Sequence, residues 1–278
     1  MKVSHMMIAP DDSIDLQLHT VYSDGQWQPE ALFAHLARER FRVVSITDHD
    51  TMEHLNELRA LGRAHGVHVV PGVEMTTSWR GKSAHLLCYA AEFRGDALAR
   101  MGHDTVAAQL ANTRAVYAEL IRSGHRFASE RAMPVRPIDN ARLLLAHGYA
   151  TTMDNALRMI AEAGYRSITF PLADAVTAAH ASGALAILAH PGRGGGEIQQ
   201  YDPPLLTEVL AEVPLDGIEV CYPTYREEQV SAYTAFAREH SLLMSAGSDS
   251  HGPQQRLPIP YPAVLCAELL RRCGVTMQ

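Results

Sequence analysis

The chain has few cysteines, no long apolar run and no excess of positive charge. Its 278 residues include only Cys88, Cys221, Cys266 and Cys273, and none of these forms a C-x-x-C pair. This spacing argues against a disulfide framework and against a thiolate zinc site. Cys88 and Cys221 fall in strand-like runs, where we expect them to be small core residues.

No apolar run approaches the roughly 18 residues of a membrane span, and Met1–Asp12 lacks the apolar segment of a signal peptide. We therefore expect a soluble, cytoplasmic protein without membrane association, and nothing in the sequence points to an obligate protein partner. The net charge of −7 argues against an extended nucleic-acid-binding surface but leaves room for a local basic pocket. With 47% apolar and 20% charged residues, the composition is that of a globular protein: one large domain, or a barrel with an insertion.

Seven apolar segments are predicted to be short buried strands. Most are continuous runs, as in parallel strands covered on both faces. Helical patterns between them cover Pro29–Arg40, His54–Gly66, Leu172–Ser182 and Tyr225–His240. The alternation predicts an α/β fold with parallel strands, a barrel with its active site at the C-terminal strand ends. The strands are Ile14–Leu18, Val43–Thr47, Val67–Val73, Ala84–Tyr89, Ala184–Ala189, Gly217–Cys221 and Leu242–Ala246.

One stretch, Gly95–Arg166, has no strand-like segment, and helices are predicted over Ala107–Ser123, Ile138–His147 and Thr152–Ala163. We expect residues 13–94 and 167–278 to form the barrel, with 95–166 as a helical insertion over the active-site mouth. Arginines in the insertion would suit an anionic substrate, although solvated helix faces would account for most of them. They are Arg114, Arg122, Arg126, Arg131, Arg136, Arg142 and Arg158.

Residue types that bind metals gather where these strands end. Four rich patches are Asp15–Gly25, Thr47–Asp50, Ala189–Gly192 and Gly247–Gly252, and the chain has 15 histidines. Residues two apart on a strand share a face, so neighbouring patch members can converge on one ion. Imidazoles and carboxylates at strand ends are what a multi-metal hydrolytic site needs. The predicted ligands are Gln17, His19, Asp24, His49, Glu74, His85, His190, Asp249 and His251.

This ligand set is large and contains no sulfur. Nitrogen and oxygen ligands suit Mn, our first choice, as well as Zn or Fe, with Mg at the most carboxylate-rich position. Because one tetrahedral ion cannot use so many side chains, two or three divalent ions are implied. Arg193, with Arg142 as the first choice from the insertion, is predicted to hold phosphate oxygens, and Gly194, Gly195 and Gly196 would let backbone amides approach an anion. His190 or Asp48 could protonate the leaving oxygen, and the sequence does not choose between them.

The chain resembles the polymerase and histidinol phosphatase (PHP) family of metal-dependent phosphoesterases over most of its length. The resemblance implies a distorted (β/α)7 barrel with a trinuclear centre, commonly of Mn, Fe or Zn. It is strongest to small bacterial members with a helical insertion, which remove the 3′-phosphate of 3′,5′-bisphosphonucleotides or trim short RNA from its 5′ end. The stretch Arg136-Pro137 with Ala141-Arg142 resembles that subgroup's R-P-H-x-A-R pattern, which implies that Arg136 also binds substrate. The family motifs are D-L-x-L-H-T-x-x-S-D-G, I-T-D-H-D-T, P-G-V-E, H-L-L-C-Y, L-A-H-P-G-R and A-G-S-D-S-H-G.

Two residues depart from that pattern. Gln17 stands where the family has a histidine, and Ile138 stands where the subgroup has one. An amide oxygen is a neutral, weaker ligand than imidazole, so one ion is predicted to be held loosely. Ile138 removes a polar contact at the substrate end, which affects the expectation of a nucleotide substrate but not that of phosphoester hydrolysis.

The sequence therefore predicts hydrolysis of a phosphomonoester on a small anionic substrate, a nucleotide or the 5′ end of a short RNA, by a hydroxide that bridges the metal ions. Two alternatives remain open. An amidohydrolase acting on a C–N bond would use similar ligands but would need no phosphate pocket. A catalytically degenerate metal-binding module would hold fewer than two ions, and Gln17 is its only support.

Overall fold

The computed structural model describes residues 6–128, 133–194 and 199–278. It divides into two compact units, one formed by Met1–Gly102 with Phe170–Gln278 and the other by His103–Thr169. Helix α3 (Ala97–Arg122) begins in the first unit and continues into the second. Within the described residues, none of the helices combines the length and apolar character required to cross a membrane.

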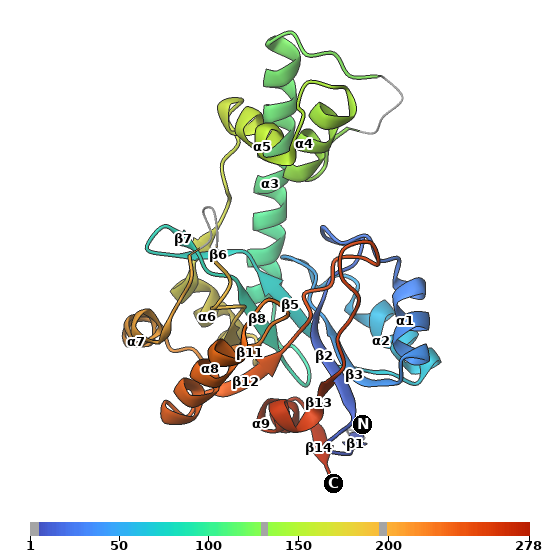
Figure 1. Cartoon of the computed structure of the whole chain (residues 1–278), viewed down its shortest axis with the longest axis vertical. Helices are drawn as coiled ribbons and strands as arrows, with labels where there is room; N and C mark the ends of the chain where they lie inside the picture. The colour runs from blue at the N-terminus through green and yellow to red at the C-terminus, as the bar shows by residue number, and fades with distance from the viewer. Residues whose placement is uncertain (1–5, 129–132, 195–198) are drawn as a thin grey trace. The chain divides into compact units, whose positions relative to one another are not determined.

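All seven predicted strand segments are found in the first unit, in two sheets (Figure 1). The larger sheet has the order β12-β11-β10-β8-β5, and the smaller has the order β13-β2-β3-β4. The predicted segment Val67–Val73 is split between them at Pro71. The strands are β12 (Leu243–Ala246), β11 (Gly217–Cys221), β10 (Leu185–Leu188), β8 (Leu86–Tyr89), β5 (Gly72–Met75), β13 (Tyr261–Pro262), β2 (Ser13–Leu18), β3 (Phe41–Ile46) and β4 (His68–Val69).

The expectation of parallel strands is wrong for β8, which runs antiparallel to both β5 and β10. The reason is a hairpin between β5 and β8, formed by β6 (Thr77–Trp79) and β7 (Lys82–Ser83). Its turn residues, Arg80 and Gly81, have φ values of 49° and 74°. Left-handed conformations at both central residues are typical of two-residue hairpin turns, so the chain reverses here without a crossover helix.

The two sheets are joined by backbone contacts at two places, which we call the seams. At the first seam Leu18 pairs with Ser250, and the amide of Asp249 donates to the carbonyl of Gln17 over 2.9 Å. At the second seam His49 pairs with Glu74. The strands β2, β3, β5, β8, β10, β11 and β12 thereby form a circuit. The seams are isolated bridges rather than ladders, so the fold is a mixed α/β fold without a continuously hydrogen-bonded barrel.

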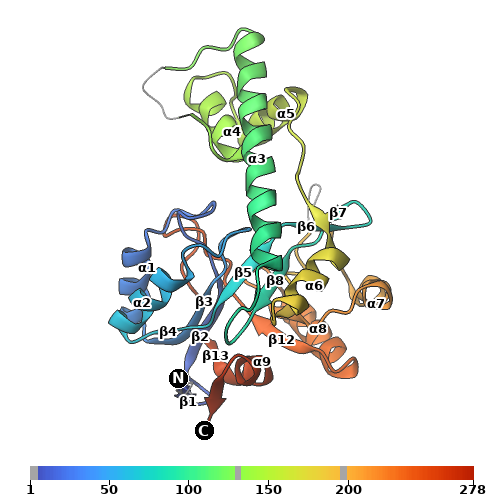
Figure 2. The same ribbon diagram turned by 180° about the vertical axis from the view of Figure 1, so that it is seen from behind.

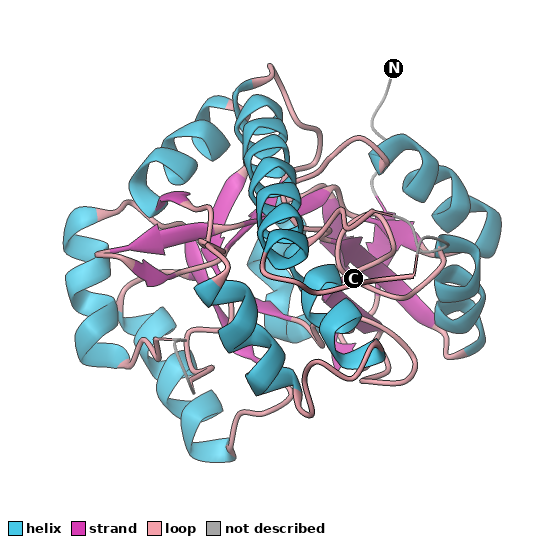
Figure 3. Cartoon of the chain, turned by 90° about the horizontal axis from the view of Figure 1, so that it is seen from above, coloured by secondary structure: helices cyan, strands magenta, loops and turns pink. Residues whose placement is uncertain are grey.

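Helices cover the outer faces of these sheets, and in Figure 3 the strands (magenta) lie inside the helices (cyan). Helices α1 (Pro29–Arg38) and α2 (Leu55–His65) lie beside the smaller sheet (Figure 2), where Leu32, Phe33 and Leu36 enter a core with Val44 and Ile46. The larger sheet shares the main core with the remaining helices and with the terminal pair β1 (Met6–Ile8) and β14 (Val275–Met277). These helices are α6 (Leu172–Ala181), α7 (Pro203–Glu212), α8 (Glu227–Glu239), the 3-10 helix η1 (Ala263–Cys266) and α9 (Ala267–Arg272); the short strand β9 (Phe170–Pro171) pairs with β6.

The second unit is helical, with α4 (Pro137–Ala146) and α5 (Met153–Glu162) following α3. It has its own small core, which includes Val116, Leu120 and Ile160. Thr152 caps α5 by accepting a hydrogen bond from the amide of Asn155 over 3.2 Å. The expected position of this unit over the active-site mouth stays a prediction.

Candidate metal centre

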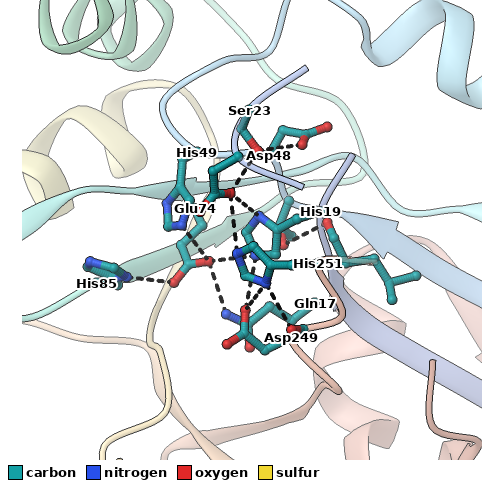
Figure 4. Close-up of polar contacts among 12 residues, drawn as sticks. Gln17, His19, Ser23, Asp48, His49, Glu74, His85, Asp249 and His251 are labelled. Atoms are coloured by element: carbon teal, nitrogen blue, oxygen red, sulfur yellow. Dashed lines mark hydrogen bonds and ion pairs between the residues drawn. The ribbon is translucent and has the colours of Figure 1, made fainter. Parts of the chain in front are cut away.

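The circuit of strands places all nine predicted ligands at one rim, seven of them labelled in Figure 4. Most of them end or follow parallel strands, as the sequence predicts. His85 instead precedes its strand. Because β8 is antiparallel, its beginning lies beside the end of β5 and brings His85 to the same rim. The antiparallel strand therefore explains how a residue at the start of a strand joins residues at the ends of others.

Glu74 is the centre of this cluster. Its Oε1 lies 3.0 Å from Nδ1 of His85 and 3.1 Å from Nε2 of His190. Its Oε2 lies 3.0 Å from Nε2 of His19 and accepts a hydrogen bond from Nε2 of Gln17 over 3.0 Å. One carboxylate thus contacts four side chains from three other strands, β2, β8 and β10, which makes Glu74 suited to bridge two ions.

The electrostatics of Glu74 favour its charged form. Only 1% of the side chain is exposed, and this burial by itself would raise its pKa. The electrostatic influence of His49, the close approach of His19 and the contact with His190 outweigh burial and hold the pKa of Glu74 well below its usual range. A buried charge of this kind is stable only while its partners remain in place.

A second carboxylate, Asp249, lies beside the first. Its Oδ1 is 3.2 Å from Nε2 of His19 and 3.5 Å from Nδ1 of His251. Burial opposes ionisation, but the imidazole of His19 beside it lowers the pKa of Asp249 to about 2. His251 in turn places Nε2 3.2 Å from Oδ1 of Asp24 and links the loop after β2 to the cluster.

These residues fit metal binding. Three groups bring their ligand atoms within 4.8 Å of one another. Both ring nitrogens of His19 and Nδ1 of His49 are buried and have no hydrogen-bond partner among the described residues, although Nε2 of His19 lies near two carboxylates. Imidazole nitrogens that approach carboxylates without hydrogen-bond geometry are suited to share an ion with them. The groups are His19 with Asp24, His49 and His251; His49 with Glu74 and His85; and His19 with Glu74 and Asp249.

Strained backbone presents several of these groups. Asp50, His190 and Asp249 follow β3, β10 and β12 with φ values of 55°, 29° and 53°. Residues other than glycine adopt this conformation only where surrounding contacts hold them, commonly at functional sites. The amide of His190 donates to Oε2 of Glu219 over 2.8 Å, and Oδ2 of Asp50 accepts from Oγ1 of Thr76 over 2.6 Å. The strain is therefore fixed by specific hydrogen bonds.

The predicted catalytic residues differ in their surroundings. Both oxygens of Asp48 accept hydrogen bonds, Oδ1 from the amide of Thr20 and from Oγ of Ser23 and Oδ2 from Oγ1 of Thr20, over 2.6–2.7 Å. Burial lowers the pKa of His190, which favours the neutral imidazole at neutral pH. Arg193 is 38% exposed, and its guanidinium lies 3.7 Å from Oδ2 of Asp249. Arg193 thus lies next to the cluster and faces solvent, where an anionic substrate can reach it.

The other predicted phosphate-binding arginines lie in the second unit. Arg136 and Arg142 both pair with Oδ1 of Asp139, over 3.2 Å and 3.6 Å. The predicted residues Arg131, Gly195 and Gly196 lie outside the described residues.

Sequence reasoning missed several residues that support the cluster. Glu219, in the middle of β11, is fully buried, and burial raises its pKa well above the usual value. Tyr222 donates to Oδ2 of Asp249 over 2.8 Å. Asp15 accepts from the amides of Ser248 and Ile259 over 2.9 Å and 3.0 Å, and burial raises its pKa to about 7. An acidic residue inside an apolar strand was the available signal for Glu219 and Asp15, whereas nothing in the sequence distinguished Tyr222 from a core tyrosine.

The sequence also matches a domain family and several known proteins. The PHP domain profile matches residues 15–202. The chain is 30% identical to the phosphoribosyl 1,2-cyclic phosphate 1,2-diphosphodiesterase of Eggerthella lenta, over 88% of this chain and 96% of that protein. It is 30% identical to the 5′-3′ exoribonuclease Rnm of Escherichia coli (86% and 85% covered) and 28% identical to the 3′,5′-nucleoside bisphosphate phosphatase of Chromobacterium violaceum (87% and 88%).

The fold has solved relatives as well. A structure from Bifidobacterium adolescentis, described as a metal-dependent phosphoesterase, superimposes with a TM-score of 0.78 at 23% identity and covers 95% of this chain and 98% of its own. At this identity the likeness concerns the fold alone.

Proposed function

Because the chain belongs to the PHP domain family and is a metal-dependent phosphoesterase, we propose that it hydrolyses a phosphomonoester of a small nucleotide or of the 5′ end of a short RNA. The observation that carries the proposal is the cluster around Glu74, where imidazoles from several strand ends meet one buried carboxylate. Such a cluster can hold ions next to an exposed guanidinium, as phosphoryl transfer requires.

The nine predicted ligands are proposed to hold two or three divalent ions, with Mn as the first choice. Bound ions would supply Lewis acidity toward phosphate oxygens and would lower the pKa of water. The protein's own contribution is to keep its carboxylates charged and its imidazoles oriented before substrate arrives. The low pKa values of Glu74 and Asp249 serve this role, since both remain ionised at neutral pH.

The circuit of strands is proposed to correspond to a distorted (β/α)7 barrel, and the second unit to the predicted helical insertion over the active-site mouth, with arginines for the substrate. Arg193 would hold phosphate oxygens, assisted by Arg142 and Arg136. For protonation of the leaving oxygen, His190 remains the candidate and would have to take up a proton in the substrate complex, because burial favours its neutral form. Asp48 is better suited to position the loop after β2, because both of its oxygens already accept hydrogen bonds.

The nucleotide class is supported by the relatives. The proteins from Escherichia coli and Chromobacterium violaceum are named for action on RNA and on 3′,5′-nucleoside bisphosphates, and the one from Eggerthella lenta for a ribosyl cyclic phosphate. All three substrates carry phosphate on ribose. We therefore propose a phosphate on a ribose ring as the shared element, with the bisphosphonucleotide as the first substrate to test.

Replacing Arg193 with alanine is expected to lower kcat/KM for 3′,5′-bisphosphonucleotides by about 10- to 100-fold, from loss of a charge-assisted hydrogen bond worth about 1.5–3 kcal/mol. Phosphate release is measured with Mn, Zn, Fe and Mg in turn. Metal content should stay unchanged, because Arg193 is not among the predicted ligands.

The matched control is Arg59→Ala. Arg59 is similarly exposed, at 32%, and pairs with Glu92; its removal should leave kcat/KM within about twofold, as for most surface changes. Equal loss in both variants would remove Arg193 from the substrate site. If no nucleotide releases phosphate with any of the four metals, the substrate proposal is wrong.

A further inference from the structure

Strand β11 is the one strand of the circuit whose end supplies none of the nine predicted ligands. It lies between β10 and β12. His190 follows the end of β10, and Asp249 and His251 follow the end of β12. Tyr222 directly follows β11 and is 5% exposed. A tyrosine buried between two ligand-bearing strands can act on both of them.

Because of the hydroxyl of Tyr222, the two carboxylate oxygens of Asp249 have different partners. It donates to Oδ2 over 2.8 Å, and the guanidinium of Arg193 lies 3.7 Å from the same oxygen. Oδ1 faces the imidazoles of His19 and His251. With Oδ2 engaged by a hydroxyl, Asp249 presents one oxygen to the cluster (Figure 4 shows the residues around Oδ1). Hydrogen-bond partners of this kind orient ligating carboxylates.

The ring of Tyr222 reaches the other flanking strand. It packs edge-on against the imidazole of His190, with centroids 5.4 Å apart and planes at 62°. Nε2 of His190 lies 3.1 Å from Oε1 of Glu74, and the ring of Tyr222 packs against the same imidazole, so the two contacts together limit its orientation. The side chain of Tyr222 therefore restrains two predicted ligands, His190 and Asp249, which lie 59 positions apart in the sequence.

Tyr222 is itself in contact with Arg256. The guanidinium of Arg256 lies 5.4 Å from the centroid of its ring. Arg256 also donates to the carbonyl of Ser248 over 2.6 Å and so ties the loop after β12 to the same place. The phenol is thus enclosed by contacts on the ring and at the hydroxyl, and it has little freedom to rotate away.

We propose that Tyr222 is a positioning residue that holds Asp249 as a one-oxygen metal ligand and fixes the orientation of His190. The inference rests on the proposed metal-dependent function. It assigns to β11 the task of aligning ligands that its neighbours supply, and it predicts that metal affinity depends on a hydroxyl that need not touch the ion.

The test compares Tyr222→Phe with the wild-type protein. Removing the hydroxyl is expected to weaken the affinity for Mn or Co(II) by about 10- to 100-fold, the loss typical of supporting partners. Freed Oδ2 should let Asp249 bind through both oxygens, so the d–d absorption of the Co(II)-loaded variant should change in position and intensity. Affinity is measured by titration of the chelator-treated protein, and kcat should fall more than KM rises.

The matched control is Tyr233→Phe. Tyr233 is 2% exposed and donates to the carbonyl of Tyr201 over 3.2 Å, so this variant loses a comparable buried hydrogen bond without contact to a predicted ligand. It should lower the Tm of the metal-free protein about as much as Tyr222→Phe does but leave affinity and the Co(II) spectrum unchanged.

The outcomes are distinguishable. If the wild-type protein binds no divalent ion, the proposed function fails and this inference fails with it. If the wild-type protein binds ions and Tyr222→Phe matches it in affinity and in Co(II) spectrum, only the role of Tyr222 is overturned. Equal loss of affinity in the Tyr233→Phe control would likewise overturn it, because the effect would then follow from general loosening of the core.

Discussion

Replacing Glu74 with glutamine is expected to lower kcat/KM by more than about 100-fold and to remove most of the bound metal. Loss of a residue that only supports a metal ligand typically costs about 10- to 100-fold, so the loss of a ligand itself should exceed that range. Glutamine keeps the shape of the side chain but loses the charge that its imidazole partners compensate. Its amide group would also place a donor where Glu74 now accepts from Gln17. Phosphate release and metal analysis after dialysis measure the two effects.

The chain offers a sharp control for this variant in Glu219. Both carboxylates are buried in the same sheet, but burial raises the pKa of Glu219 well above its usual value and so favours the neutral form, which glutamine resembles. The amide oxygen can still accept from the backbone of His190, which Glu219 does over 2.8 Å. Activity and metal content should stay within a few-fold of wild type. If Glu74→Gln behaves like this control, Glu74 is not the hub of a metal centre.

Replacing Gln17 with histidine is expected to raise the metal content of the purified protein, by up to about one ion per chain. Gln17 now uses its amide nitrogen to hold Oε2 of Glu74, and its own Oε1 has no hydrogen-bond partner among the described residues. An imidazole at this position would add a stronger ligand to the group formed by His19, Glu74 and Asp249. Metal analysis of protein purified without added metal gives the occupancy.

Gln17→Leu provides the comparison, since leucine has a similar volume but neither a ligand atom nor a donor. We expect it to hold less metal than wild type. An ideal Cβ at Gly247 would lie only 2.4 Å from Cβ of Gln17, and because both variants keep that Cβ, the close approach of β2 to this loop is not disturbed. Unchanged occupancy in Gln17→His would place residue 17 beyond reach of the ions and confine it to supporting Glu74.

Much of the site could be predicted from the sequence because its ligands follow strands that are recognisable as continuous apolar runs. His19, His49 and Asp249 need only the rule that functional residues gather at the carboxyl ends of parallel strands. His85 was harder, since its position depends on the reversal of β8, and that reversal depends on the two left-handed residues Arg80 and Gly81. The only local signal for the β6–β7 hairpin is the pair Arg80-Gly81 between two short strands, and the α/β pattern around it favours parallel strands.

Other features follow from distances that local sequence patterns do not encode. Tyr222 and Asp249 are 27 positions apart, and only the pairing of β11 with β12 brings the hydroxyl to the carboxylate. The splitting of Val67–Val73 depends on Pro71, where Val70 still donates to Val44 of one sheet while the carbonyl of Pro71 accepts from Ala90 of the other. Each of these contacts is tertiary, so composition and periodicity could not predict them.

The two seams have a thermodynamic consequence. Gln17, Asp249, His49 and Glu74 supply backbone contacts that join the sheets, and the same residues supply side chains to the cluster. An ion held there would bind the protein with its two sheets joined at the seams in preference to a form with the sheets separated. At an ion concentration of about 100 times the dissociation constant, this preference would stabilise the joined form by about 2.7 kcal/mol. Folding stability and metal affinity are therefore one coupled property of this rim, and substitutions that weaken one should weaken the other in proportion.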